Sequence, residues 1–219
     1  MAVDYPPAAI FDRTAAFSPV AYTASQTAVL LVDYYAHFES HLPAGQFKSA
    51  VERAVALRDW ARSNGIFVVH GQIDVRGPSH VLQTHKSSTR LTGFQKAMMT
   101  TPGAEDEVAD LASGWLTEGD NEETMVRREP GTYNALLSFG LVEQLKKREI
   151  KSLIIGGVAT SACVLSTVWA AADSGYVVTV ARDACGDPEQ ARHDMLMDKI
   201  LNSLSHVTTV DELKEAWGK

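Results

Sequence analysis

The passage from a buried strand to a helix within residues 153–164 constrains the fold of this chain more than any other feature. Three apolar residues, 153–155, precede Gly156-Gly157, and the pair Thr160-Ser161 can cap a helix over residues 162–174. Cys163 is thereby predicted in the first turn of that helix. The unpaired N–H groups and the positive end of a helix stabilise a thiolate and an oxyanion. The segment therefore predicts a nucleophilic cysteine with a lowered pKa.

Strand-like and helix-like segments alternate along the chain, which indicates βαβ units. The predicted strands are residues 27–33, 66–70, 124–128, 153–155, 176–182 and 207–210. The predicted helices are residues 47–63, 138–148, 162–174, 188–204 and 211–217. We expect an α/β fold: a single domain over residues 1–219, with three α/β/α layers, an N-terminal extension at residues 1–24 and a mainly parallel, Rossmann-like sheet of about six strands.

Composition excludes several classes of protein. The net charge of −7 argues against a nucleic-acid partner, because binding phosphates requires a basic face. We also expect no membrane partner, because no apolar run reaches the ~20 residues that span a bilayer. The start of the chain lacks a basic and then apolar signal, so a cytoplasmic location is expected. There Cys163 and Cys185 would both remain free thiols, Cys185 with a structural role at a strand end.

Charged or reactive residues occur in or after three predicted strands, whose carboxyl ends would share one edge of the sheet. Asp33 ends the first strand, Cys163 follows another, and Arg127 and Arg128 lie in a third. Asp33 could merely cap a loop or helix, and the arginines could be a solvated pair. Alternatively, the carboxylate of Asp33 faces Cys163 and takes its proton.

Three stretches resemble the isochorismatase-like cysteine hydrolases. They are AVLLVDYYAHFE at residues 28–39, VRREPGTY at residues 126–133 and GVATSACVLSTVWAAADSGYVVTVARDAC at residues 157–185. The resemblance implies a catalytic Asp, Lys and Cys, with the Asp at Asp33 and the Cys at Cys163. It also implies a cis peptide between Val158 and Ala159 and an oxyanion hole made by the N–H groups of Ala159 and Cys163.

The lysine of the family pattern is replaced by arginine in this chain. The motif places Arg127 at that position, and Arg128 takes it under another gap placement. Arginine keeps the positive charge that would support the other two groups, but it does not lose its proton as lysine can.

The resemblance further indicates a substrate pocket for a small molecule. Its expected lining is Tyr34, Tyr35, Phe38 and Tyr133, with a contribution from residues 74–102. Trp169 could line the pocket or belong to the core. His37 and His41 lack an accompanying Asp-x-His pattern, so we expect two surface histidines, no metal and no cofactor.

Cys163 favours attack on an amide, ureide or carbamoyl-type carbonyl, with cleavage of a C–N bond through a thioester. The alternatives are an isochorismatase-type hydrolase that acts on a vinyl ether and a non-catalytic member in which arginine has replaced a required lysine. Members of such families commonly assemble, so a homo-oligomer, a dimer or a tetramer, is expected.

Overall fold

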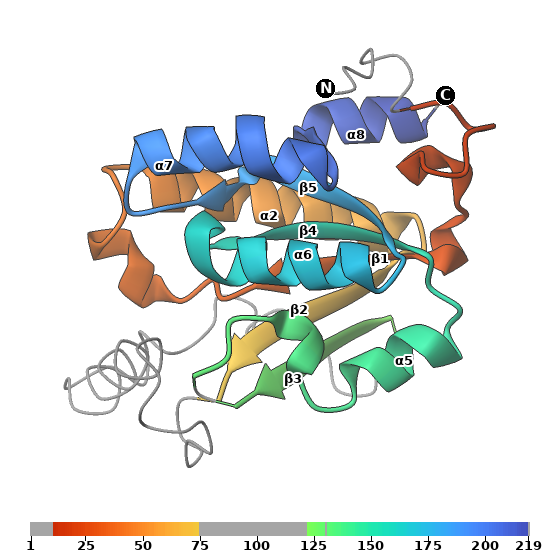
Figure 1. Cartoon of the computed structure of the whole chain (residues 1–219), viewed down its shortest axis with the longest axis horizontal. Coiled ribbons are helices and arrows are strands. Elements are labelled where there is room, and N and C mark those ends of the chain that lie inside the picture. Colours follow the sequence, from red (N-terminus) through yellow and green to blue (C-terminus); the bar gives the residue numbers. More distant parts are fainter. Residues whose placement is uncertain (1–10, 75–121, 130, 219) are drawn as a thin grey trace.

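The computed structural model describes residues 11–74, 122–129 and 131–218 (Figure 1). Its centre is a six-stranded sheet with the order β3-β2-β1-β4-β5-β6, and each pair of neighbouring strands is parallel. The strands are β1 (Thr27–Val32), β2 (Phe67–Ile73), β3 (Glu123–Arg128), β4 (Ser152–Val158), β5 (Val177–Gly186) and β6 (His206–Thr208). The predicted fold class, a single Rossmann-like parallel sheet with flanking helices, is confirmed.

Helices cover both faces of this sheet (Figure 1). The α-helices are α2 (Gln46–Ser63), α5 (Leu141–Lys147), α6 (Leu165–Asp173), α7 (Gln190–Met195) and α8 (Val210–Trp217). Short 3-10 turns are η1 (Pro19–Ala21), η2 (Ala24–Gln26), η3 (Ala36–Ser40), η5 (Ala135–Leu137) and η8 (Leu201–Ser203), and π-helical turns are η6 (Thr160–Val164) and η7 (Leu196–Ile200). None of the helices in the described ranges combines the length and hydrophobicity that a membrane span requires.

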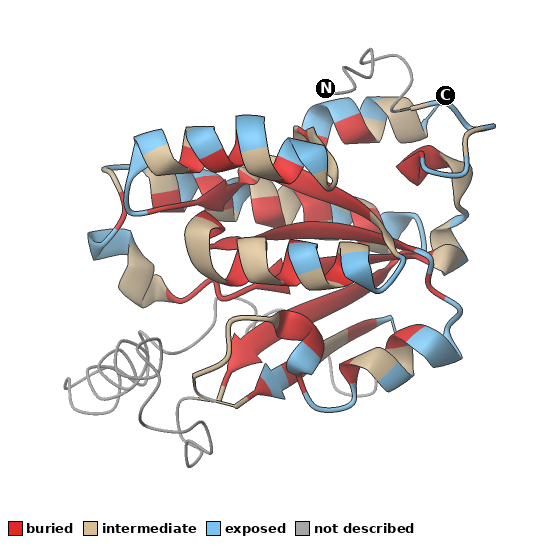
Figure 2. Ribbon diagram, in the orientation of Figure 1, coloured by how far each residue is buried: buried red, intermediate tan, exposed pale blue. Residues whose placement is uncertain are grey.

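Two apolar clusters hold the layers together, one on each face of the sheet. The central strands β1 and β4 are buried along their whole length (Figure 2), as expected of parallel strands covered on both sides. Alternate residues feed the two clusters: Leu30 and Ile155 pack with α6, whereas Val29 and Ile154 pack with α2 and α8.

The chain departs from the predicted helices where the helical hydrogen-bond pattern changes. The predicted helix 188–204 is divided among α7, η7 and η8. The predicted helix 162–174 begins as the π-helical turn η6, and regular α6 starts only at Leu165. Cys163 therefore lies in a π-helical turn, and such turns are frequent at functional sites.

The order of the strands determines where a ligand site is expected in this fold. From β1 the sheet grows in one direction through β2 and β3, and in the other through β4, β5 and β6. The loops after β1 and β4 consequently diverge at the carboxyl edge of the sheet, where ligands of open α/β sheets bind.

Candidate active site

Asp33 follows β1 in a backbone conformation that is uncommon for a non-glycine residue, with φ of 59°. Its N–H donates to the carbonyl of Gly71 on β2 at 3.0 Å, and its own carbonyl accepts from the N–H of Tyr35 at 2.9 Å. The residue is buried. These backbone bonds fix the main chain of Asp33 at the end of β1.

Arg128, at the end of β3, forms a two-pronged ion pair with that carboxylate. Its Nη1 donates to Asp33 Oδ1 at 3.1 Å and its Nη2 to Oδ2, while Nε donates to the carbonyl of Thr132 at 3.0 Å. Burial by itself would lower the pKa of Arg128, but the charge and hydrogen bonds of Asp33 raise it above its ordinary value. The guanidinium is thus a fixed cation committed to Asp33.

Arg127 does not occupy the position that the sequence motif gave it. Its side chain is exposed, and its Nη2 lies 3.8 Å from the sulfur of Met125. Successive side chains of a strand point to opposite faces of the sheet, so the neighbour of buried Arg128 faces outward. Of the two arginines considered, the structure brings Arg128 to Asp33.

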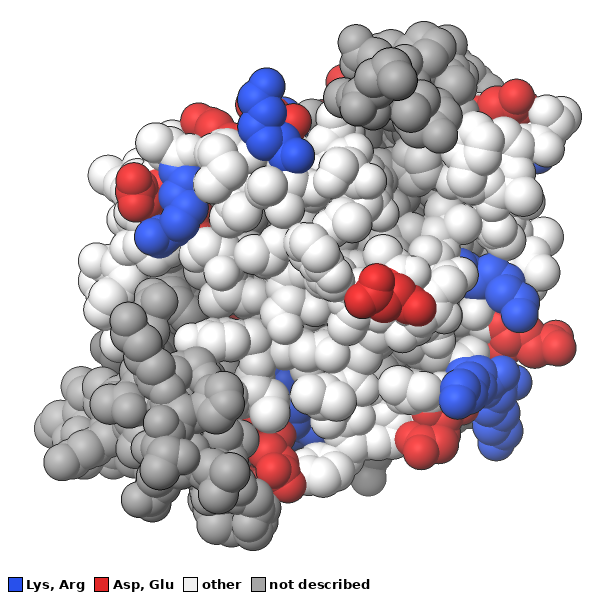
Figure 3. Space-filling view, in the orientation of Figure 1, with Lys and Arg blue, Asp and Glu red and all other residues white. Residues whose placement is uncertain are grey.

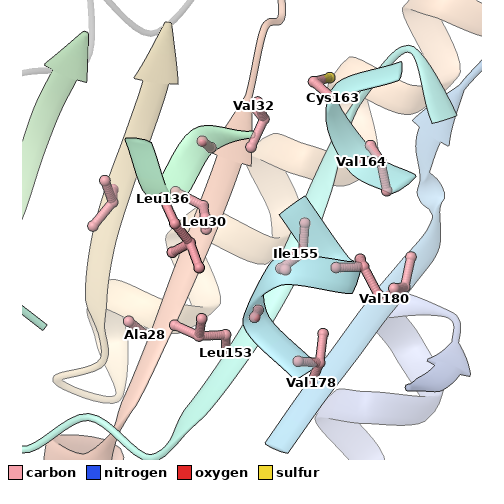
Figure 4. Packing of buried hydrophobic residues seen from close by; sticks show 14 of the residues in the cluster. Ala28, Leu30, Val32, Leu136, Leu153, Ile155, Cys163, Val164, Val178 and Val180 are labelled. Carbon is pink, nitrogen blue, oxygen red and sulfur yellow. The ribbon is translucent and has the colours of Figure 1, made fainter. Parts of the chain in front are cut away.

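Cys163 reaches the same edge from η6, and in Figure 4 its side chain lies near Val32, the last residue of β1. Only 2 % of the residue is exposed. Two acceptors lie within reach of the thiol: the carbonyl of Ala159, at 3.6 Å from Sγ, and the side chain of Asp33.

The expected low pKa of Cys163 is wrong for the protein without substrate. Burial raises the pKa of this thiol well above its ordinary value, and the charge of Asp33 raises it further. The positive charge of Arg128 opposes both effects without overcoming them. Desolvation is the largest of these effects, and with its pKa raised so far the resting group is a thiol.

The peptide bond between Val158 and Ala159 is cis, as the family resemblance implied. The carbonyl of Ala159 accepts from the N–H groups of Ala162 at 3.1 Å and Val164 at 3.4 Å. The backbone of Ala159 is therefore part of the turn that presents Cys163.

The expected aromatic lining is divided between core and edge. Tyr34 and Tyr35 are buried, and their hydroxyls are committed to the backbone: that of Tyr34 donates to the carbonyl of Ala184, and that of Tyr35 donates to the carbonyl of Ile73 at 3.0 Å. Phe38 and Tyr133 are partly exposed. These two remain candidates for contact with a substrate, whereas Tyr34 and Tyr35 brace the strand ends.

Cys185 is a free, buried thiol within β5, and burial raises its pKa to about 12. The rings of His37 and His41 lie with centroids 4.2 Å apart, and no group of three or more potential metal ligands occurs in the described parts of the chain. Trp169 is 49 % exposed and so is not core. Most of the predicted 74–102 contribution, residues 75–102, lies outside the described residues.

Comparison with known proteins decides the family. The model of the isochorismatase domain matches residues 27–212, which is most of the chain and contains Asp33, Arg128 and Cys163. The chain belongs to the isochorismatase family.

Several known proteins are similar to this isochorismatase-family chain at low sequence identity. It is 27 % identical over 97 residues to the uncharacterized isochorismatase family protein YecD of Escherichia coli O157:H7, a match over 44 % of this chain and 50 % of that relative. The YcaC gene product of Escherichia coli, described as an octameric hydrolase of unknown specificity, is similar in structure with TM-score 0.63, 22 % identity and coverage of 88 % of this chain and 79 % of that one. A cysteine hydrolase from Pseudomonas syringae pv. phaseolicola has TM-score 0.62, 17 % identity and coverage of 90 % and 94 %.

One group of this isochorismatase-family site, Asp187, was not predicted from the sequence. Asp187, just after β5, accepts a hydrogen bond from the N–H of Ser161 at 2.7 Å, two residues before Cys163. The signal in the sequence was the Gly186-Asp187-Pro188 run at a strand end, where a polar side chain is free to turn toward the neighbouring strand.

Proposed function

We propose that this protein is a cysteine-dependent hydrolase that cleaves a C–N bond of a small amide, ureide or carbamoyl compound through a thioester. The observation that carries the proposal is the convergence of Asp33, Arg128 and Cys163, from β1, β3 and η6, at the carboxyl edge of the sheet. A thiol beside a carboxylate that is itself held by a fixed cation is a nucleophile next to its base.

In the first half-reaction, the sulfur of Cys163 attacks the carbonyl carbon while its proton passes to Asp33. Because the raised pKa of Cys163 keeps the resting sulfur protonated, proton transfer accompanies the attack. The carbonyl π electrons move to oxygen, and the N–H groups of Ala159 and Cys163 hold the oxyanion. The tetrahedral intermediate then collapses, the C–N bond breaks, and the proton on Asp33 goes to the departing nitrogen.

In the second half-reaction, Asp33 takes a proton from a water molecule that attacks the thioester carbonyl. The second tetrahedral intermediate expels the sulfur, which takes back the proton from Asp33, and the carboxylic acid product leaves. Every bond and proton in the cycle is accounted for by the substrate, water, Asp33 and Cys163. For that reason we propose no metal and no cofactor.

Arg128 supports this cycle as a fixed charge. Both prongs of its guanidinium engage the carboxylate of Asp33, and its Nε is taken by Thr132. Arginine does not donate a proton in proteins. Its proposed role is to orient Asp33 and to balance its charge. Phe38 and Tyr133 are the proposed contacts for the substrate at the rim.

The test is ammonia release from a panel of small amides, ureides and carbamoyl compounds. Asp33→Asn and Cys163→Ala should each lower kcat by at least ~100-fold, because they remove the base and the nucleophile. The matched control is Cys185→Ala, which removes the other buried thiol and should leave turnover within a few-fold of wild type.

Isochorismate assayed beside the panel distinguishes the vinyl ether alternative. Turnover of isochorismate that survives Cys163→Ala, with no amide turned over by the wild-type protein, would overturn the proposal. Absence of turnover on every compound would favour the non-catalytic alternative.

We further propose that the protein acts as a homo-oligomer, a dimer or a tetramer, in the cytoplasm. The face of the molecule over α6 carries few charged groups (Figure 3), and Trp169 on that helix is half exposed. Aromatic side chains of this kind are enriched at protein interfaces. Two free buried thiols are typical of a reducing compartment. Sedimentation of Trp169→Ser beside the wild-type protein tests the assembly.

A further inference from the structure

A buried polar cluster outside the reacting groups holds the turn that bears Cys163. Its members are Thr160, Asp187 and His193, none of which has a part in the bond-making steps above. The Asp187 side chain is fully buried, and its Oδ2 accepts from the N–H of Ser161 at 2.7 Å. The cluster therefore grips the two residues at the start of η6.

Asp187 is itself held from the other side by the start of α7. Its Oδ1 accepts from Arg192 Nε at 2.7 Å and from the N–H of Glu189 at 3.3 Å. Burial would raise the pKa of Asp187, but hydrogen bonds from Ser161 and Arg192 bring it below its ordinary value. The buried acceptor is thus a carboxylate with both oxygens in use.

The hydroxyl of Thr160 has two partners but only one proton. It donates to the carbonyl of Gly186 at 3.1 Å, and Nδ1 of His193 lies 2.8 Å from the same hydroxyl oxygen. A carbonyl only accepts, so the proton of Thr160 goes to Gly186 and His193 donates from Nδ1. Burial lowers the pKa of His193, which favours the neutral ring.

We propose that Asp187 and the pair Thr160–His193 are positioning residues for the nucleophile. They fix η6 so that the sulfur of Cys163 faces Asp33. By occupying the N–H of Ser161, Asp187 also leaves the oxyanion to Ala159 and Cys163. This inference rests on the proposed function and names residues outside its reacting groups.

Hydrogen bonds hold η6 on two sides, so the loss of either set should shift the position of Cys163. Ala162 and Val164 donate to the carbonyl of Ala159 on the strand side, and Asp187 and Gly186 hold Ser161 and Thr160 on the α7 side. A displacement of ~1 Å at a reacting atom can cost ~100-fold in rate. Removing one tie should therefore reduce the chemical step more than substrate binding.

The test compares Thr160→Val with Thr160→Ser, and adds Asp187→Asn, using p-nitrophenyl acetate as the chromogenic acyl donor. Thr160→Val keeps the shape but removes the hydroxyl, whereas Thr160→Ser keeps the hydroxyl. We expect Thr160→Val and Asp187→Asn to lower kcat ~10- to 100-fold with KM within ~3-fold, and Thr160→Ser to restore kcat to within ~3-fold.

Thr179→Val is the matched control, because the Thr179 hydroxyl is buried in β5 without a hydrogen-bond partner among the described residues. Its kcat should equal that of wild type. Wild-type kcat in both Thr160→Val and Asp187→Asn, together with an inactive Cys163→Ala, overturns the inference and leaves the proposed function standing. Full activity of Cys163→Ala on this probe overturns the proposed function itself. If Asp187→Asn fails to fold, the Thr160 pair decides alone.

Discussion

Replacing Arg128 by methionine should be among the most destabilising single changes at the site. The side chain of Arg128 is 0 % exposed and that of Asp33 is 5 % exposed, so the change leaves a carboxylate buried without its cation. Removing one partner of a buried ion pair typically costs ~3–5 kcal/mol. Arg127→Met is the matched control: this neighbouring residue is exposed, and surface changes of this kind stay within about 0.5 kcal/mol.

Urea unfolding at pH 7 measures the effect. With a slope of ~2 kcal/mol per molar, the expected loss lowers the midpoint of Arg128→Met by roughly 2 M, and that of Arg127→Met by less than ~0.3 M. Asp33→Asn/Arg128→Met removes both charges and should be more stable than Arg128→Met alone. Arg128→Lys keeps the charge but loses the fork and the bond to Thr132, so it should fall between wild type and Arg128→Met.

Equal midpoints for Arg128→Met and Arg127→Met would refute this reasoning. So would a double variant whose loss equals the sum of the two single losses, because the charges would then not be coupled.

Three further predictions concern titration and packing. The rate at which iodoacetamide alkylates Cys163, followed by mass spectrometry, should be slow at pH 6 and rise about tenfold per pH unit beyond pH 8. The reason is that the raised pKa of Cys163 keeps the sulfur protonated. Rapid labelling at pH 6 would contradict this. Burial would raise the pKa of Glu123, but hydrogen bonds from His70 and Arg58 lower it from an ordinary 4.5 to about 2, so the stability that Glu123 contributes is complete above pH ~5 and lost as the pH falls toward 2. The difference in unfolding free energy between wild type and Glu123→Gln should therefore shrink from pH 7 to pH 3. An unchanged difference would count against this explanation. Gly157→Ala would place a methyl group 2.7 Å from the carbonyl oxygen of Val32 and should lower the free energy of unfolding by ~1–3 kcal/mol. The control Gly71→Ala, whose methyl group has its nearest contact at 3.5 Å, should lower it less. Equal losses of stability in thermal unfolding would disprove the steric explanation.

Much of the fold could be predicted because the central strands are strongly apolar and the first long helix ends at an Asn64-Gly65 pair. The first strand was expected at residues 27–33 and is β1 (Thr27–Val32), and the helix expected at residues 47–63 is α2 (Gln46–Ser63). The π-helical turn at Thr160–Val164 could not be predicted, since the same residues are compatible with an α-helical start. In the structure this turn is held by hydrogen bonds from Thr160 to Gly186 and from Ser161 to Asp187, which are distant in the sequence.

The choice between Arg127 and Arg128 depended on one residue of register. A shift of one position in a strand exchanges the face on which a side chain lies. The segment Glu123–Arg128 has no clean alternation of apolar and polar residues, so its sequence does not indicate which arginine faces inward. The pairing of Ile73 on β2 with Arg128 settles the register in the structure.

Two properties of the site depend on contacts that are remote in the sequence. The hydroxyl of Tyr34 is bonded to Ala184, 150 residues away, and that of Tyr35 to Ile73, 38 residues away. The pKa of Cys163 is raised chiefly by burial and by the charge of Asp33. Local sequence identified the reactive residues, but their surroundings are set by the packing of distant strands.

The ion pair between Arg128 and Asp33 also has a mechanical meaning. Among the described strands β3 is outermost, and β2 separates it from β1. Adjacent strands are ~4.8 Å apart, so β3 and β1 are ~10 Å apart, and the ion pair joins them across β2. Fraying of β3 would separate Arg128 from the carboxylate of Asp33, which lies beside the sulfur of Cys163. The rate of amide hydrogen exchange along β3 therefore reports the fraction of molecules in which the ion pair, and with it the catalytic arrangement, is formed.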